Sequence, residues 1–426
     1  MVTLRILKGK DAWTFLVELE SRELDLVVFK ESVRPIIDQV KLREDDAVSE
    51  LTERLYGVKL APEEFQVSID VIEEALSLVD RDLPVIEELV SKVKEFYSRQ
   101  KIESFIAKEK GSEYGVTWIP LERVGIHVPE GEGFAYFSTL IYTAVPAKVA
   151  GVPQVFVFTP PLANGAVNPY LLAAAKLSGV DRVYRIGGPI AVAAMAYGTT
   201  TIPEVQKIFG TGDLLFMTAK KIVSPDVAVD FPSTPVETVV LAGAGANPLT
   251  VAWELVSQAE HGLDTFLMVI TTDESLADAI VSATRSLSEE VSMPVIEESL
   301  GSCSILVLES WREVEEAIDV ISPARVVIVG EINEELRFAN VGATIWNTPS
   351  PLVDYALGVP QRLPSSRYSR FRGPLTLYDF MKSFLTVKLS REFAEEIADL
   401  SIEIARVEGM ELHARYIEKM LEGSFG

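Results

Sequence analysis

The sequence predicts an α/β protein with two Rossmann-like α/β/α sandwich domains, and two runs in which apolar strands alternate with helices predict it. The first run contains the strand-like segments "QVFVF" and "RVYRI", and an alanine-rich helical segment follows each of them. The second run starts at "ETVVLAGAGANP" and continues through "TFLMVIT" and "ARVVIVG". Buried strands that alternate with helices pair in parallel, so each run predicts a parallel sheet covered by helices.

Helical periodicity outside these runs predicts helical extensions at both ends of the chain. Residues 84–111 have the pattern of one long amphipathic helix, and the chain from about residue 374 is expected to be helical. The predicted division is an N-terminal extension, a first Rossmann-like domain with a helical N-terminal part, a second Rossmann-like domain, and a helical C-terminal dimerisation domain. The N-terminal extension is residues 1–22, and the first Rossmann-like domain is residues 23–123 together with 233–370. The second Rossmann-like domain is residues 124–232, and the dimerisation domain is residues 371–426.

Charge and cysteine content narrow the class of protein. The 426 residues include 63 acidic and 39 basic side chains, which gives a formal net charge of -24. This charge opposes binding to nucleic acid or to an anionic membrane surface. One cysteine, Cys303, excludes an internal disulfide and a cysteine-based metal cage, and no signal peptide is recognisable. The apolar stretches are shorter than the roughly 20 residues of a membrane span. A globular cytoplasmic protein is expected.

Two glycine-containing turns have the general form of phosphate-binding turns. In "VVLAGAGANP" a proline, Pro248, stands where the third glycine of a dinucleotide fingerprint would be, so an ordinary turn is the favoured interpretation. In "RIGGPIAV" the paired glycines precede a helix whose first amides can hold a phosphate. A tight strand-to-helix turn explains the same residues equally well.

The segment "VSQAEHGLDT" places a glutamine and a histidine three residues apart. On a helix, Gln258 and His261 leave the same face and can share one small ligand or ion. The alternative is an ordinary helix end, where the histidine interacts with the last carbonyls before Gly262. The spacing alone favours the helix end.

Several segments together, in their order and spacing, resemble the histidinol dehydrogenase family. They are "GIHVPEG", "VPAKVAGVPQV", "RIGGPIAVAAMAYGT", "KIFGTGD", "TAKKIVS", "VSQAEHGLDT", "PLVDYALG" and "ELHARY". The resemblance covers nearly the whole chain. It implies a zinc-dependent, NAD-linked oxidoreductase of histidine biosynthesis that oxidises L-histidinol through the aldehyde to L-histidine. It also implies an intertwined homodimer with two Rossmann-like domains that lack a standard fingerprint.

The resemblance also implies where the metal and the substrate bind. The positions of the family's zinc ligands hold Gln258, His261, Asp354 and His413, and these residues together with Glu408 are the expected substrate-binding set. Two imidazoles, a carboxylate and an amide oxygen form a ligand set that suits Zn²⁺. In the intertwined homodimer, the C-terminal His413 and Glu408 are expected to come from the partner subunit. The acidic residue of the "PVET" turn, Glu237, matches the family as well.

The catalytic and cofactor positions depart from the family. Its acid/base pair of Glu and His is replaced by Ala324 and Arg325. Alanine carries no proton, and arginine cannot act as a base near neutrality. The NAD-contacting positions hold His127, Ile190 and Asp213 in place of Tyr, Gln and Asn. An aspartate near a pyrophosphate repels it, so NAD binding in the family manner is doubtful.

Two functions are therefore open. One is a zinc-dependent oxidoreductase that acts on histidinol with substitute proton carriers, or on another alcohol. The other is a degenerate homologue that binds zinc and a small ligand with little or no turnover.

Overall fold

The computed structural model describes residues 4–20, 26, 28–130 and 136–423, and its contacts divide the chain into two units. The first unit comprises the chain up to Gln100 together with Leu121–Phe380, and the second comprises Lys101–Pro120 together with the chain from Met381 onward. Two parallel sheets lie in the first unit and one antiparallel sheet in the second. The predicted α/β class with two parallel sheets is confirmed. No helix in the described part of the chain is long and apolar enough to cross a membrane.

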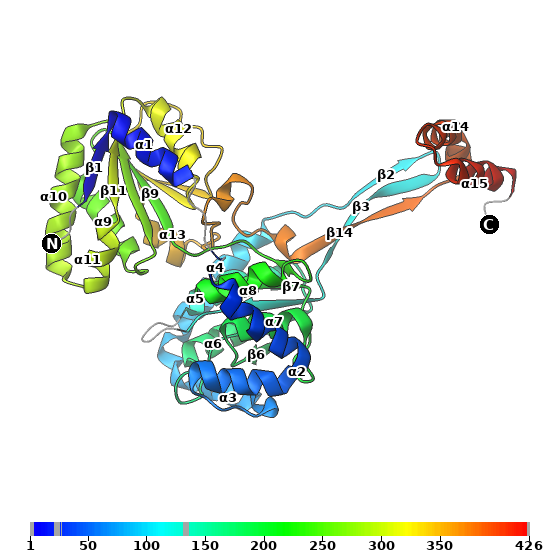
Figure 1. Ribbon diagram of the computed structural model, residues 1–426, viewed down its shortest axis with the longest axis horizontal. Helices are drawn as coiled ribbons and strands as arrows, with labels where there is room; N and C mark the ends of the chain where they lie inside the picture. The colour runs from blue at the N-terminus through cyan, green and yellow to red at the C-terminus, as the bar shows by residue number, and fades with distance from the viewer. Residues whose placement is uncertain (1–3, 21–25, 27, 131–135, 424–426) are drawn as a thin grey trace. The chain divides into compact units, whose positions relative to one another are not determined.

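A six-stranded parallel sheet forms one half of the first unit (Figure 1). Its order is β1 (Arg5–Lys8), β11 (Ser304–Val307), β10 (Phe266–Thr271), β9 (Glu237–Ala242), β12 (Arg325–Val329) and β13 (Ala343–Trp346). The helices of this half are α1 (Gly9–Glu20), α9 (Pro248–Ala259), α10 (Glu274–Val291), α11 (Pro294–Gly301), α12 (Trp311–Ile321) and α13 (Ser350–Ala356). The described part of the expected N-terminal extension thus supplies the edge strand β1 and helix α1.

Side-chain alternation along the strands separates two apolar layers. Val240 of β9 belongs to the layer under α9, α10 and α11, whereas its neighbours Val239 and Leu241 belong to the layer under α1 and α12. Successive side chains on a strand point to opposite faces, so a strand that is apolar throughout must be covered on both sides. This requirement explains why "ETVVLA" predicted a central strand correctly.

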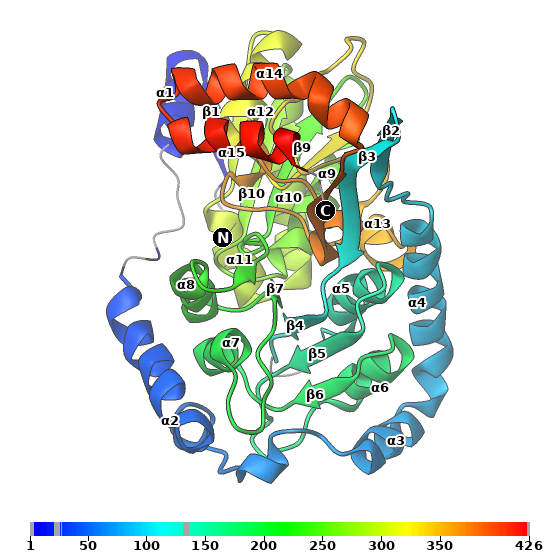
Figure 2. The same cartoon turned by 90° about the vertical axis from the view of Figure 1, so that its right-hand side faces the viewer.

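A five-stranded parallel sheet forms the other half of the first unit. Its order is β6 (Arg182–Tyr184), β5 (Gln154–Phe158), β4 (Arg123–His127), β7 (Lys207–Gly210) and β8 (Ala228–Val229). Helices α7 (Gly188–Tyr197) and α8 (Leu214–Val223) cover one face, and α5 (Phe137–Val149) and α6 (Pro169–Leu177) cover the other (Figure 2).

Three N-terminal helices pack on this five-stranded half. Helix α2 (Lys30–Tyr56) contacts α7 and α8, α3 (Ile69–Leu78) contacts α6, and α4 (Leu83–Ser98) contacts α5 and α6. The prediction had grouped residues 23–123 with 233–370 instead. This grouping differs from the packing of the three helices. Helical periodicity shows that a helix has an apolar face, but it does not show which sheet that face covers. The domain boundaries otherwise stay a prediction.

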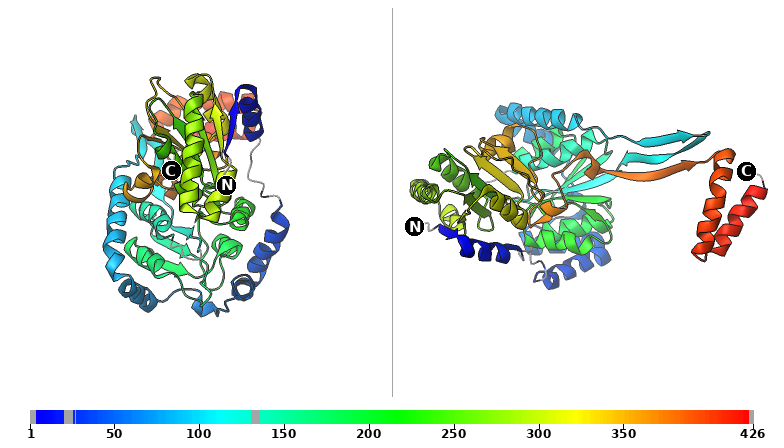
Figure 3. Two further views of the ribbon diagram at one scale, coloured as in Figure 1. Left: turned by 90° about the vertical axis from the view of Figure 1, so that its left-hand side faces the viewer. Right: turned by 90° about the horizontal axis from the view of Figure 1, so that it is seen from above.

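The second unit corrects two expectations. Residues 84–111 do not form one helix, because α4 ends at Ser98 and Phe105–Glu109 form strand β2. The chain after residue 374 is not wholly helical, because Met381–Lys388 form strand β14. Strand β3 (Ser112–Pro120) pairs antiparallel with both, and the helices α14 (Arg391–Val407) and α15 (Glu411–Glu422) follow (right-hand view of Figure 3). Strand β2 pairs with β3 across the two-residue turn Lys110–Gly111, where both residues have positive φ, whereas β14 pairs with β3 from far along the chain. Helical periodicity detects neither pairing.

Candidate active site

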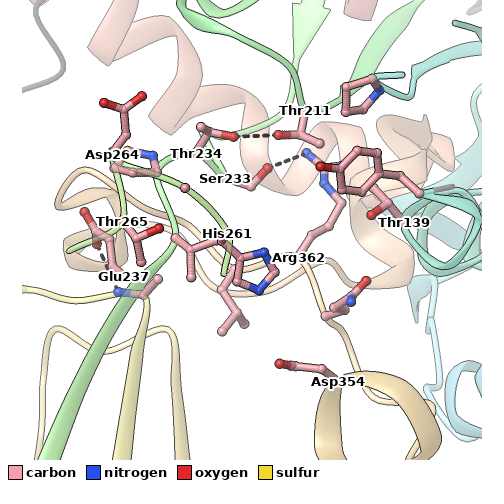
Figure 4. A pocket seen from close by; sticks show the side chains of 18 of the residues that line it. Thr139, Thr211, Ser233, Thr234, Glu237, His261, Asp264, Thr265, Asp354 and Arg362 are labelled. Carbon is pink, nitrogen blue, oxygen red and sulfur yellow. Dashed lines mark hydrogen bonds between the residues drawn. The ribbon is translucent and has the colours of Figure 1, made fainter. Parts of the chain in front are cut away.

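A pocket of about 410 Å³ lies between the two parallel sheets of the first unit (Figure 4). From the five-stranded half, its walls include Pro129 after β4 and Thr211 after β7. From the six-stranded half, they include Glu237 at the start of β9, Thr265 just before β10, and Arg325 at the start of β12. The pocket therefore joins the carboxyl edge of one sheet to the amino edge of the other.

Glu237 is a fixed carboxylate in this wall, and its side chain is nearly fully buried. Its Oε1 accepts a hydrogen bond from the backbone N–H of Ser366 at 2.9 Å, and its Oε2 accepts one from the N–H of Ala324 at 3.2 Å. Two backbone donors hold a carboxylate in one orientation more firmly than solvent does. The Glu237 carboxylate is therefore held in one orientation in the pocket wall.

Arg325 and Asp354 form a bidentate ion pair beside this carboxylate. The Nη1 of Arg325 donates to Oδ2 of Asp354 at 2.8 Å, and the Nη2 donates to Oδ1 at 2.9 Å. The two side chains are only 8% and 11% exposed. Both residues line the pocket. A strong charge-assisted pair therefore joins the predicted metal ligand Asp354 to the arginine that replaces the family's catalytic histidine.

His261 lies in the turn after α9 and lines the pocket, and Figure 4 shows its imidazole directed toward the middle of the pocket. Burial lowers the pKa of His261, and the neighbouring Arg325 lowers it further. The imidazole is therefore neutral near pH 7. His261 lies two residues beyond the end of α9 and lines the pocket, so its position is compatible with the prediction that it binds a ligand.

Gln258 lies in the last turn of α9, behind the pocket wall. Its Nε2 donates to Oγ of Ser350 at 2.9 Å, and its buried Oε1 has no hydrogen-bond partner among the described residues. Ser350 is bonded in turn to the carboxylate of Glu254, whose pKa is raised by burial. The amide of Gln258 is thus oriented by a buried network and leaves one acceptor unsatisfied.

Two of the predicted zinc ligands, Gln258 and Asp354, have other side-chain partners in the first unit, and His413 was expected from a partner subunit. Both carboxylate oxygens of Asp354 are engaged by Arg325, and Gln258 is not among the residues that line the pocket. His413 lies exposed on α15 of the second unit. Within the described residues, no three His, Cys, Asp or Glu side chains form a group that could hold a metal.

The three predicted NAD contacts are all engaged inside the protein. Buried His127 receives the backbone N–H of Gly188 on Nε2 at 3.0 Å, so its protonated Nδ1 donates to the carbonyl of Thr211 at 2.7 Å. Ile190 is fully buried, and Asp213 caps α8 by accepting from the N–H of Phe216 at 2.8 Å. The side chains of His127 and Asp213 are therefore already used inside the protein, and that of Ile190 belongs to the core.

Hydrogen bonds inside the protein also engage amides of the two glycine turns. The imidazole of His127 occupies the N-terminus of α7, where Gly188 would otherwise offer its amide to a phosphate. The "RIGGP" segment is therefore a strand-to-helix turn that is closed by a histidine. In the other turn, the amides of Gly243 and Ala244 donate to the carbonyls of Val329 and Glu331, so they are not available for a phosphate either.

Sequence reasoning missed a buried charge cluster at the edge of the pocket, formed by Lys220, Asp230 and Arg362. Asp230 accepts from Nζ of Lys220 and, at 2.6 Å, from Nη2 of Arg362, which also lies 3.3 Å from Oγ of Ser233. Burial favours the neutral carboxyl, but the two cations outweigh it and lower the pKa of Asp230. Arg362 lines the pocket, and no spacing in "GVPQRLP" connects it with Asp230.

The remaining predicted substrate ligand, Glu408, caps the C-terminal end of α14 in the second unit and is exposed, as His413 is. All residues that line the pocket belong to the first unit. The structure therefore brings together Glu237, His261 and Asp354, while the two C-terminal residues lie on a separate unit of the chain.

Comparisons with known proteins agree on one family. The family model described as histidinol dehydrogenase matches residues 19–420. The chain is 35% identical to a histidinol dehydrogenase of Syntrophotalea carbinolica over 93% of each chain. It is also 35% identical to one of Oceanobacillus iheyensis, covering 91% of this chain and 92% of that one. The crystal structure of histidinol dehydrogenase from Elizabethkingia anophelis superimposes with a TM-score of 0.90 at 26% identity, covering 99% of both chains.

Proposed function

Because the chain belongs to the histidinol dehydrogenase family, we propose that it is an oxidoreductase that oxidises a small alcohol in the pocket between its two parallel sheets. L-histidinol is the first substrate to test, with NAD as the electron acceptor, since these are the family's substrate and cofactor. The observation that carries the proposal is the match over residues 19–420, which includes every wall of the pocket. The fixed carboxylate of Glu237 offers a partner for a cationic amino group such as that of histidinol.

Proton transfer in this pocket needs a residue other than the family's pair. Ala324 carries no proton, and Arg325 is committed to Asp354. Among the described acceptors that line the pocket, Glu237 is held by two backbone amides, and Asp264 lies toward the margin in Figure 4. His261 is directed toward the middle and is the acceptor that we assign to the alcohol proton. The NAD that the family uses would supply the hydride acceptor, and no contact with it is assigned here to His127, Ile190 or Asp213.

A homodimer is the second part of the proposal. Helices α14 and α15 carry apolar side chains that are largely exposed in the single chain, among them Leu400, Ile404, Val407, Leu412 and Tyr416. An amphipathic helix needs a cover for such a face, and a second copy of the chain provides one. The family's intertwining would then place the partner subunit's Glu408 and His413 at this pocket. Light scattering at micromolar concentration tests the dimer, and a monomeric mass would contradict it.

The replacement of the acid/base pair keeps a second function open, a homologue that binds a small ligand with little turnover. Loss of one general acid/base residue typically lowers a rate by about 10²- to 10⁴-fold. The deciding experiment is NADH formation from L-histidinol and from a series of small alcohols between pH 7 and pH 10. Turnover near an ordinary enzymatic rate of roughly 1 to 10 s⁻¹ that is lost in His261→Asn supports the oxidoreductase. Ligand binding without NADH formation for any alcohol supports the homologue.

A further inference from the structure

We propose that the buried ion pair of Arg325 and Asp354 takes the place of the family's divalent metal, so that this protein maintains its pocket without a metal ion. The inference rests on family membership and on the geometry of this pair, and it does not require that any particular alcohol is the substrate.

Arg325 already engages both oxygens of the carboxylate that the family's metal would use. Two parallel N–H···O bonds of 2.8 and 2.9 Å use both oxygens of Asp354. Bidentate pairing of this kind is strong and directional. The pair also connects the first residue of β12 to helix α13, so it fixes the position of one pocket wall, as a shared metal ion otherwise would.

The charges around the pair oppose a second cation. Arginine keeps its charge at every physiological pH, so a positive charge is always present beside Asp354. Asp354 is the bonded partner of Arg325. Glu254, His261 and Tyr355 also interact with this arginine electrostatically. A Zn²⁺ ion would repel the guanidinium and would also have to draw Asp354 away from it. A buried arginine without its partner is strongly destabilising.

The donors that remain in this unit are too few for zinc. Without Asp354, the predicted set in the first unit consists of an imidazole nitrogen of His261 and Oε1 of Gln258, and both are neutral. Structural and catalytic zinc sites use three or four protein ligands, commonly with anionic members. Even with the partner subunit's His413 added, all three of these ligands would be neutral while the dication faced a guanidinium.

The test is zinc retention by the full-length protein. Wild type, Arg325→Met, Asp354→Asn and the double variant Arg325→Met/Asp354→Asn are incubated with zinc, dialysed against a mild chelator and analysed for metal per chain. Arg337→Met serves as the control, because that arginine is largely exposed. Wild type is expected to retain far less than one zinc per chain. In the wild type, a zinc ion must break the buried pair, which costs roughly 3 kcal/mol or more. Arg325→Met lacks this cost and is therefore expected to bind zinc about 100-fold or more tightly than the wild type.

The double variant identifies the ligand. If Asp354 is released by Arg325→Met, adding Asp354→Asn abolishes the gain in zinc binding. Wild type that retains one zinc per chain and loses it in Asp354→Asn overturns the proposal, and so does a folded Arg325→Met that gains no zinc. If Arg325→Met fails to fold, wild type and Arg325→His are compared with the same criteria. Absence of turnover with every alcohol would contradict the proposed function but would leave these zinc measurements unchanged.

Discussion

Replacing Asp230 by asparagine is expected to destabilise the protein strongly. The aspartate lies between Lys220 and Arg362, and the three side chains are at most 4% exposed. Asparagine keeps the shape but removes the negative charge that contacts both of these cations. Removal of one partner from a buried ion pair costs roughly 3 to 5 kcal/mol. Because the lost charge served two cations, the upper part of this range is expected.

The assay is equilibrium unfolding in urea, followed by far-ultraviolet circular dichroism. Glu73→Gln is the matched control, because its 2.7 Å pair with Lys176 connects two helices of the same half but is about half exposed. Exposed pairs contribute at most about 1 kcal/mol. The double variant Asp230→Asn/Lys220→Met should recover part of the loss by removing one unpaired cation. A loss for Asp230→Asn no larger than that of Glu73→Gln would refute the reasoning.

Three further outcomes follow from the buried groups. Burial lowers the pKa of His127 to about 4, so its imidazole signal in NMR should not titrate between pH 8 and pH 5, and a midpoint near the ordinary value of about 6.5 would contradict this. Since the unfolded chain takes up that proton between about pH 6.5 and 4, His127 should make the free energy of unfolding fall as the pH falls through this window. Burial raises the pKa of the Cys303 thiol to about 12, so iodoacetamide should label it slowly in the native protein and quickly in urea; fast native labelling would show that the site opens.

The sequence predicted the parallel sheets well because their strands are apolar on both faces. Segments such as "TFLMVIT" leave a chain of this length few alternatives to a central strand between two helical layers. The strands of the second unit were missed for the opposite reason. Residues 105–109 directly follow a segment with helical periodicity, and they form a strand by pairing with Ser112–Pro120 across the Lys110–Gly111 turn. The glycine of that turn was a local signal for a hairpin, whereas the pairing of Met381–Lys388 with the same strand depends on the fold.

The candidate site was predictable as far as residue types and family positions reach. His261 and Glu237 line the pocket as their positions suggested. The partner of Arg325 was not predictable, since Asp354 is 29 residues away on another element and had been assigned to a metal. The sequence also could not show that His127 closes a helix N-terminus, because a histidine at the end of a strand is equally compatible with a cofactor contact. Both corrections depend on side-chain geometry.

Whether a guanidinium has replaced the metal is tested most directly by an X-ray structure of crystals grown with zinc, with data collected at the zinc absorption edge. The expected result is Arg325 bonded to both oxygens of Asp354 and no anomalous peak beside His261. A peak at about 2.0 to 2.2 Å from His261 and Asp354, with Arg325 displaced from the carboxylate, would contradict it.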